Sequence, residues 1–397
     1  MANRHTRLIL SLGALLLALV AQGFAKPLES TLPPPSGVVV VSARVEGRPA
    51  TFLLDTGAER SCLDASFAEH LQFKPTNVEG MRQPYGNRAV SSLRVRELGI
   101  DSFELQNVEM LAADLTSLSM GSGISIDGIL GSDVLKRFTV RIDFSSGLVR
   151  FGTDAGESPG GVAVPLQPVH NLYFVPLSIQ GTPVSLLLDT GANASSVSSH
   201  AWSGITMHWQ PQTTIDGVRS TGGSEARFAL IPTIEIAGAM SRDVPLRVQP
   251  QTKDGLFADA GFNGLLGTDV LRQFIVTLDL ANNRMYLTSN PKARADRYLF
   301  STIGIQFVKD AQDGFTIMAV WKPSPAARAG LKIGDRIIAV NQLDAHQMSL
   351  DDLSREIHGR PGTKINLVID SDGLRHSVPM ATSCLLCPLD AVRDKAQ

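Results

Sequence analysis

Two aspartates stand in nearly identical local sequence and are the first candidates for chemistry. Asp55 and Asp189 each follow a run of apolar residues, and each begins the tetrapeptide Asp-Thr-Gly-Ala. Two carboxyls that face each other in a poorly solvated site cannot both ionise cheaply, so one keeps its proton while the other is charged. The charged carboxylate can take a proton from a water molecule, and the protonated one can hydrogen-bond a carbonyl oxygen. The pair is therefore a candidate acid–base dyad for hydrolysis of an amide bond.

The residues around each aspartate suit this role. The apolar residues before it predict a buried strand that ends at the carboxyl. The hydroxyls of Thr56 and Thr190 are placed to brace one turn against the other. Gly57 and Gly191 permit a sharp bend and present backbone N–H groups to the carboxylates. These four residues are the predicted supports of the dyad.

A second motif repeats at almost the same spacing. The sequence DGILGSDVLKRF begins at Asp127, and NGLLGTDVLRQF begins at Asn263. The second motif recurs after 136 positions, whereas Asp189 follows Asp55 by 134. Two separate motifs at nearly one offset indicate a duplicated unit of about that length.

Each unit is expected to continue in the same way after its apolar-apolar-Gly sequence. A short helix follows, with Ser132 or Thr268 as its predicted N-cap and an acid next to it. Two alternating strands joined by a turn are then predicted over residues 139–151 and again over residues 275–287.

These paired motifs resemble those of aspartic proteases of the retropepsin/pepsin type, with both halves in one polypeptide. The resemblance covers about residues 37–289. It implies a mainly β, bilobal, duplicated β-barrel fold in which Asp55 and Asp189 form the catalytic dyad, in a substrate cleft between the lobes. Alanine follows each Asp-Thr-Gly, as in retropepsins, and has no hydroxyl to donate to the carboxylate. Losing that donor leaves the dyad less acidic, so we predict a pH optimum nearer neutrality than that of pepsin.

The same resemblance implies a β-hairpin flap that closes over substrate. In the first lobe Tyr85 and Gly86 lie in a turn similar to a pepsin-type flap. In the second lobe Gly222 and Gly223 occupy the equivalent interval, more like a retropepsin flap tip. The alternative interpretation is two ordinary surface hairpins.

The sequence changes in character from about residue 300. The stretch SPAARAGLKIGDRIIAVN, followed by the helix-like DDLSREIHG, resembles bacterial PDZ domains, which are small α+β domains. By this resemblance Gly304, Ile305, Gln306 and Phe307 form the loop whose backbone N–H groups hold the terminal carboxylate of a peptide or protein. The peptide would add a strand to a sheet edge. The alternative is a PDZ-like fold that serves only to pack on the lobes.

The predicted domain organisation starts with a signal peptide. A basic start, a short apolar run and small residues before Lys26 are typical of a secretory signal, and the alternative is an uncleaved membrane anchor. We therefore expect a secreted or periplasmic protein with no stable membrane span after cleavage. In an oxidising compartment Cys384 and Cys387 can close a disulfide. The expected segments are the signal at 1–25, a Pro-rich linker at 26–36, the first lobe at 37–152, a linker at 153–161, the second lobe at 162–290, the PDZ-like domain at 300–380 and a tail at 381–397.

Composition excludes several other classes. The formal net charge of the 397 residues is −2 with both signs interspersed, which gives no basis for a nucleic-acid partner. The sequence has no metalloprotease motif, no phosphate-binding P-loop and no Gly-x-Ser-x-Gly turn, so no metal and no cofactor are expected. The sequence therefore predicts an exported aspartic endopeptidase that acts on polypeptides. The rival prediction is a non-catalytic peptide-binding protein of the cell envelope that keeps the protease fold.

Overall fold

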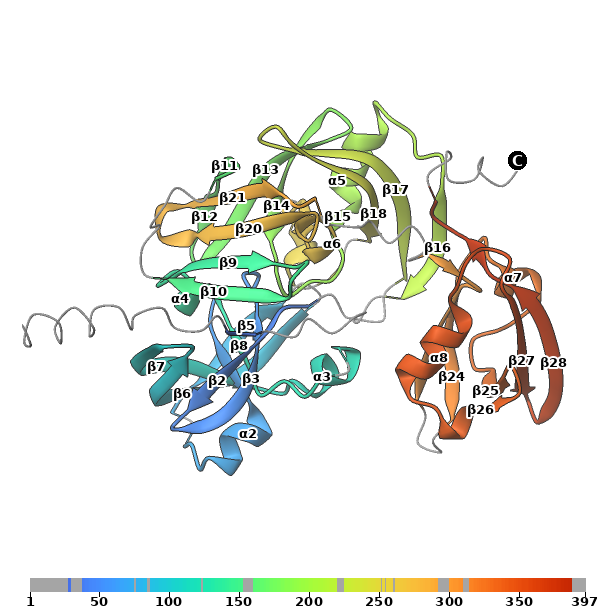
Figure 1. The fold of residues 1–397 in the computed structure, drawn as a ribbon, viewed down its shortest axis with the longest axis horizontal. Coiled ribbons are helices and arrows are strands. Elements are labelled where there is room, and N and C mark those ends of the chain that lie inside the picture. The colour runs from blue at the N-terminus through green and yellow to red at the C-terminus, as the bar shows by residue number, and fades with distance from the viewer. Residues whose placement is uncertain are drawn as a thin grey trace, which may run out of the picture.

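The structure is a computed structural model of the chain. The residues that it describes are 28–29, 38–74, 76–83, 86–122, 124–152, 160–219, 225–250, 252–253, 255–259, 261–291, 300–309 and 314–387. The flap residues Tyr85, Gly222 and Gly223 lie outside them. Among the described residues, no helix has the length and apolar character needed to span a membrane. Figure 1 shows two β lobes joined by a shared sheet, with a third domain attached at the far end of the second lobe.

The first lobe is built on a seven-stranded sheet in the order β2-β3-β8-β4-β7-β6-β5. Its strands are β2 (Val40–Val45), β3 (Arg48–Leu54), β4 (Cys62–Asp64), β5 (Val78–Gln83), β6 (Gly86–Ile100), β7 (Phe103–Ala113) and β8 (Gly128–Leu130). Its helices are α2 (Ala65–His70), α3 (Thr116–Ser122) and α4 (Ser132–Leu135). The sheet closes on itself because β2 also pairs with β6. This closure gives the barrel that the resemblance to aspartic proteases implies.

The second lobe repeats this plan in an eight-stranded sheet, ordered β12-β13-β14-β19-β15-β18-β17-β16. Its strands are β12 (Gln167–Val169), β13 (Leu172–Ile179), β14 (Thr182–Leu188), β15 (Ser196–Ser198), β16 (Thr214–Arg219), β17 (Glu225–Ile236), β18 (Ala239–Gln249) and β19 (Gly264–Leu266). Its helices are α5 (Ser199–Thr206), η1 (Leu256–Ala258) and α6 (Thr268–Leu271). β14 pairs in parallel with β19, as β3 pairs in parallel with β8. The fold therefore confirms the duplication.

A six-stranded sheet belongs to both lobes. Its order is β1-β10-β9-β20-β21-β11. The strands are β1 (Leu28–Glu29), β9 (Thr139–Asp143), β10 (Leu148–Gly152), β11 (Val162–Pro165), β20 (Phe274–Asp279) and β21 (Arg284–Ser289), with η2 (Leu280–Asn282) between the last two. The two predicted strand pairs are β9–β10 and β20–β21, and β9 joins β20 antiparallel across the lobe boundary. One apolar core runs through both lobes and this sheet.

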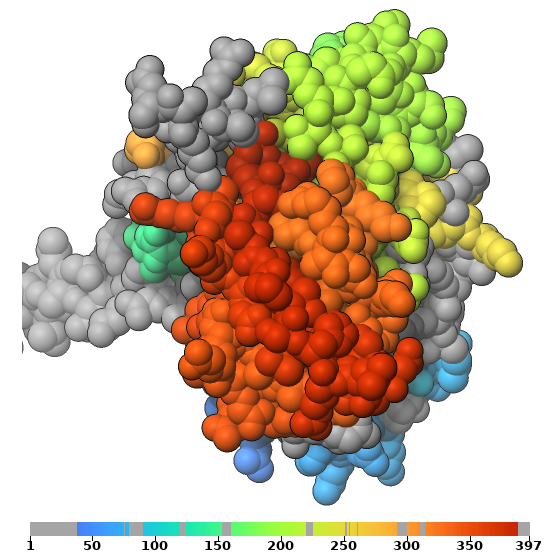
Figure 2. Space-filling model, turned by 90° about the vertical axis from the view of Figure 1, so that its right-hand side faces the viewer, coloured from blue at the N-terminus to red at the C-terminus, as the bar shows by residue number. Residues whose placement is uncertain are grey.

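The C-terminal domain, residues 300–387, has its own sheet and its own core. Its strands are β22 (Ser301–Thr302), β23 (Ile305–Lys309), β24 (Phe315–Val320), β25 (Arg336–Val340), β26 (Leu343–Asp344), β27 (Lys364–Ser371), β28 (Leu374–Ala381) and β29 (Ser383–Cys384). Its helices are α7 (Pro325–Arg328), η3 (Ala345–Gln347) and α8 (Leu350–Ile357). Seen from its own side in Figure 2, this domain lies in front of the rest of the molecule, with the second lobe above it. The mainly β fold with a terminal α+β domain is confirmed.

Candidate active site

Each predicted catalytic aspartate lies directly after a buried central strand. Asp55 follows β3, and its backbone N–H donates to the carbonyl of Leu130 at 3.0 Å. Asp189 follows β14, and its N–H donates to the carbonyl of Leu266 at the same distance. The apolar-apolar-Gly motif of each unit thus lies beside its Asp-Thr-Gly turn. These parallel strand pairs fix the backbone position of each aspartate.

The two carboxyls lie against each other's turns. A Cβ atom built on Gly57 would be 2.6 Å from Cγ of Asp189, and one built on Gly191 would be 2.5 Å from Cγ of Asp55. Only glycine leaves room for the opposite carboxyl at either position. The two carboxyls also hydrogen-bond to each other. The structure therefore brings together the two aspartates that the sequence separates by 134 positions.

Backbone amides contact each carboxylate from its own turn. Gly57 N–H donates to Oδ1 of Asp55 at 2.8 Å. Gly191 N–H donates to Oδ1 of Asp189 at 3.0 Å, and Ala192 N–H donates to the same oxygen at 2.9 Å. At Asp189 the alanine of the turn thus contributes its main-chain amide, although it has no hydroxyl.

The environment separates the two acids. Burial raises the pKa of Asp55 above its ordinary value, while hydrogen bonds from Gly57, Asp189 and Ala58 oppose the rise. Burial raises the pKa of Asp189 well above its ordinary value, and the charge of Asp55 raises it further. Two acids this close titrate as a pair. Between the two ionisations the pair holds one proton, which the two carboxyls share.

Four hydrogen bonds lock the two turns together. Thr56 N–H donates to Oγ1 of Thr190 at 3.0 Å, and Thr190 N–H donates to Oγ1 of Thr56 at 3.1 Å. The Thr56 hydroxyl donates to the carbonyl of Leu188 at 2.7 Å, and the Thr190 hydroxyl donates to that of Leu54 at 2.8 Å. Both threonines are fully buried. The cross-brace expected from these hydroxyls is present and is symmetric.

A second pair of side chains, which was not predicted from the sequence, supports each turn. In the first lobe Ser61 donates from both its N–H and its hydroxyl to Oδ1 of Asp133, at 2.9 and 2.7 Å. In the second lobe Ser195 does the same to Asp269, at 2.9 and 2.6 Å. Each serine oxygen also accepts the N–H of the motif glycine, Gly131 or Gly267, at 2.9 Å. The sequence does contain a signal for these pairs. Ser195 follows Ser61 at the offset of the Asp-Thr-Gly motif, and Asp269 follows Asp133 at the offset of the second motif.

The predicted N-caps Ser132 and Thr268 are wrong. The helices α4 and α6 begin at these residues, and their caps are the preceding glycines, without a side-chain cap. The Ser132 hydroxyl donates instead to the carbonyl of Thr56 at 3.0 Å, and that of Thr268 to the carbonyl of Ala192 at 3.1 Å. Both residues are fully buried, so their hydroxyls serve the Asp-Thr-Gly turns and not the helix ends.

Cys62 is a buried thiol in β4 near the site. Burial raises its pKa to about 12, and the charge of Asp55 adds to the rise. The thiol is therefore neutral at physiological pH and acts as a small apolar side chain. Among the described residues, no group of three or more His, Cys, Asp or Glu side chains could hold a metal ion.

The structure describes only part of the predicted flaps. Gly86 begins β6 and pairs with Gln83 across the turn. In the second lobe, β16 and β17 are the two strands that flank residues 220–224. The roles of Tyr85, Gly86, Gly222 and Gly223 therefore stay predictions.

Some of the predicted carboxylate-binding residues pack inside the C-terminal domain, and one contacts the second lobe. Gly304 has a left-handed φ of +84°, and a Cβ there would be 2.4 Å from Cβ of Ser324. Ile305 belongs to the core of the C-terminal domain, and Phe307 packs on that core. The side chain of Gln306 instead hydrogen-bonds the backbone of Arg219 in the second lobe. Peptide binding by this loop stays a prediction.

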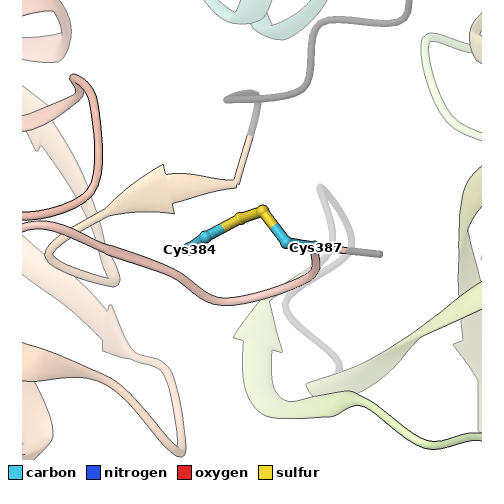
Figure 3. The surroundings of a disulfide bond; sticks show 2 residues. All are labelled: Cys384 and Cys387. Carbon is cyan, nitrogen blue, oxygen red and sulfur yellow. A yellow bond between two sulfur atoms is a disulfide. The ribbon is translucent and has the colours of Figure 1, made fainter. Parts of the chain in front are cut away.

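The expected C-terminal tail begins with an ordered segment. β29 pairs with β22, and the backbone N–H of Leu385 donates to the carbonyl of Phe300 at 2.9 Å. Figure 3 shows the disulfide between Cys384 and Cys387 in this segment.

Known proteins resemble these parts of the chain. The model of a family described as aspartyl protease matches residues 41–134 and 175–270, and that of the PDZ domain matches residues 316–370. Among solved structures, the PDZ domain of carboxy-terminal protease from Vibrio cholerae, in complex with peptide, is 29% identical. The match covers 21% of this chain and 94% of that one, with a TM-score of 0.20. The chain has no match among curated protein sequences. In its two lobes the chain belongs to the aspartyl protease family, and it carries a PDZ domain after them.

Proposed function

We propose that the protein is an exported aspartic endopeptidase whose dyad is Asp55 and Asp189. The observation that carries this proposal is the mutual approach of the two carboxyls in the locked turns, each against the opposite glycine. Burial and mutual charge leave one proton on the pair over a range of pH. One acid and one base at a single site are what hydrolysis of a peptide bond needs.

The reaction follows from the protonation of the pair. Ionised Asp55 takes a proton from a water molecule while the water oxygen attacks the peptide carbonyl carbon. Protonated Asp189 hydrogen-bonds the carbonyl oxygen and gives it the proton, which yields a neutral tetrahedral diol. Asp55 then gives its proton to the amide nitrogen as the C–N bond breaks, and Asp189 takes back a proton from the diol. The dyad ends in its starting state, and no covalent intermediate forms.

Two further parts of the proposal have separate support. Export is supported by the signal-like residues 1–25 and by the Cys384–Cys387 disulfide, because disulfides persist in oxidising compartments. Recognition of a peptide chain end is supported by the PDZ family match and by the edge position of β23 in its sheet.

The test is turnover of a mixed peptide library by the chain from Lys26 onward, measured across pH. We expect the wild type to cleave, and Asp55→Asn and Asp189→Asn each to lose at least about a hundredfold in rate. Asp351→Asn, on an exposed position of α8, is the matched control and should keep full activity. Circular dichroism establishes that each variant is folded. A wild type that binds peptides but cleaves none at any pH would favour the rival peptide-binding protein.

A further inference from the structure

The PDZ domain is joined to the second lobe through β16, the strand that leads to residues 220–224. Asp216 N–H donates to the carbonyl of Lys322 at 2.7 Å, and Lys322 N–H donates back to Asp216 at 2.9 Å. The pairing of β16 with β17 is irregular between Ile215 and Val218, which frees Asp216 for this bridge. Gly217 has φ +79°, and a Cβ there would lie 2.9 Å from the carbonyl oxygen of Val320. The strand is thus shaped for close approach of the PDZ backbone.

Gln306 contacts Arg219, the last residue of β16. Its Oε1 accepts the backbone N–H of Arg219 at 2.6 Å, and its Nε2 donates to the carbonyl of Arg219 at 3.0 Å. One side-chain amide thus makes both hydrogen bonds that a neighbouring strand would make. The indole N–H of Trp321 donates to the same Oε1 at 3.2 Å and holds the amide in place.

The position of Gln306 on β23 explains why its side chain reaches the other domain. Successive side chains of a strand point to opposite faces. Ile305 and Phe307 pack on the PDZ core, so Gln306 between them faces β16. Its backbone belongs to the segment that follows Gly304, which is the predicted carboxylate-binding loop. The same residue therefore lies in the peptide-binding segment and holds the second lobe.

An apolar cluster lies beside this loop. Leu385 and Leu386, inside the Cys384–Cys387 loop, pack with second-lobe residues at the junction of the two domains. The ring centroids of Phe228 and Phe300 are 5.3 Å apart across this junction. A Cβ on Gly304 would come within 3.1 Å of Cδ1 of Leu385. The loop is therefore packed against the junction and held to it by hydrogen bonds.

We propose that Gln306 is a positioning residue that couples binding of a peptide C-terminus at the PDZ loop to the β16–β17 hairpin of the second lobe. A peptide that adds a strand to β23 and bonds its carboxylate to the loop favours one backbone position of residues 304–307. Because both polar atoms of the Gln306 amide are bonded to Arg219, that position is transmitted to β16, which belongs to the same sheet as β14, the strand that ends directly before Asp189. A free chain end thereby regulates the dyad, and this last step rests on the proposed peptidase function.

The coupling can be measured without catalysis, by hydrogen exchange with mass spectrometry on the full chain carrying Asp55→Asn. The probe is a pool of peptides with varied apolar C-terminal residues and a free carboxylate, and its control is the same pool with amidated ends. We expect the free-carboxylate pool alone to change exchange at both residues 303–309 and residues 214–219. A change confined to residues 303–309, or no change at either segment, would overturn the proposal.

Two variants separate coupling from binding. Gln306→Leu removes both hydrogen bonds to Arg219, so the peptide-induced change should persist at residues 303–309 and disappear at 214–219. Gln306→Glu keeps the acceptor but replaces the donor with an oxygen, and it should also lose the response at 214–219. Val308→Thr, at an exposed position on the same face of β23, is the matched control and should respond like the wild type. An unchanged response at 214–219 in Gln306→Leu contradicts the proposal.

The regulatory step needs an activity measurement. With an amidated, internally quenched reporter peptide, the free-carboxylate pool should change kcat/KM of the wild type by at least about fivefold relative to the amidated pool. Gln306→Leu should reduce that ratio to near unity. Equal kcat/KM with both pools would overturn regulation by chain ends. If no reporter is cleaved, the peptidase function fails, and the exchange experiment still decides whether the domains are coupled.

Discussion

Thr56 and Thr190 each accept the other's backbone N–H, and each donates its hydroxyl to the residue before the opposite aspartate. The groups that make these four hydrogen bonds are buried, and a hydrogen bond left unmade there is costly. None of the four bonds involves a carboxyl. The distance between the turns is therefore fixed by neutral groups and does not depend on the protonation of the dyad.

Removal of one threonine hydroxyl should weaken this lock. Thr190→Val leaves the N–H of Thr56 and the carbonyl of Leu54 without their partners, and each costs about 1–3 kcal/mol. We expect a Tm lower by several degrees and a large loss of kcat. Thr190→Ser keeps the hydroxyl and should retain most of both. The measurements are calorimetry and steady-state kinetics, and a valine variant with wild-type values of both would refute this role.

Asp189→Asn should stabilise the fold near neutral pH while removing activity. The pKa of Asp189 is raised in the folded state, so the acid favours the fold below its unfolded pKa and loses that contribution as pH rises through its folded pKa. Asparagine does not titrate, so the variant does not lose stability at this position as pH rises. Thermal unfolding of both proteins should give a higher Tm for the variant at pH 7, with the difference shrinking as pH falls toward the ordinary Asp pKa. A lower Tm for the variant at pH 7 contradicts this prediction.

The pH–rate profile should be bell-shaped and should lie above the pepsin range. The acid limb reports the ionisation of the first acid of the pair, and the basic limb reports loss of the proton that the pair shares. Both pKa values are raised by burial, and the alanine turns provide no hydroxyl donor to lower them. We measure kcat/KM from acid to neutral pH. A maximum below about pH 3.5, beneath the ordinary Asp pKa, is the result that contradicts the prediction.

The serine–aspartate hydrogen bonds should contribute similarly to the stability of both lobes. Ser195→Ala removes the hydroxyl that donates to Asp269 and accepts from Gly267, and it leaves a buried N–H without its partner. We expect a loss of about 1–3 kcal/mol in the free energy of unfolding, and a similar loss for Ser61→Ala in the first lobe. Ser199→Ala, at an exposed position of α5, is the control and should change little. Denaturant unfolding measures all three.

The fold is predictable from the sequence wherever a local pattern repeats. The apolar strand, the Asp-Thr-Gly turn and the apolar-apolar-Gly strand each appear twice, so they established the duplicated fold and paired the two aspartates. The N-caps were misassigned because a buried hydroxyl was given its local role, whereas the structure gives it a partner across the turn. The second role of Gln306 had no sequence signal, because a contact between two domains leaves no periodicity in either one.

The PDZ domain is attached to the second lobe, and this attachment makes the two sides of the dyad inequivalent. The locked turns are related by a near twofold symmetry. The turns by themselves therefore do not distinguish the two directions in which a polypeptide could lie. The bridge of Asp216 with Lys322 and the bonds of Gln306 occur on one lobe of the pair. In the proposed peptidase, a polypeptide at the dyad would have the PDZ domain on the side of the second lobe, so the two directions of the polypeptide would no longer be equivalent. The appended domain gives polarity to a site that duplication had made symmetric.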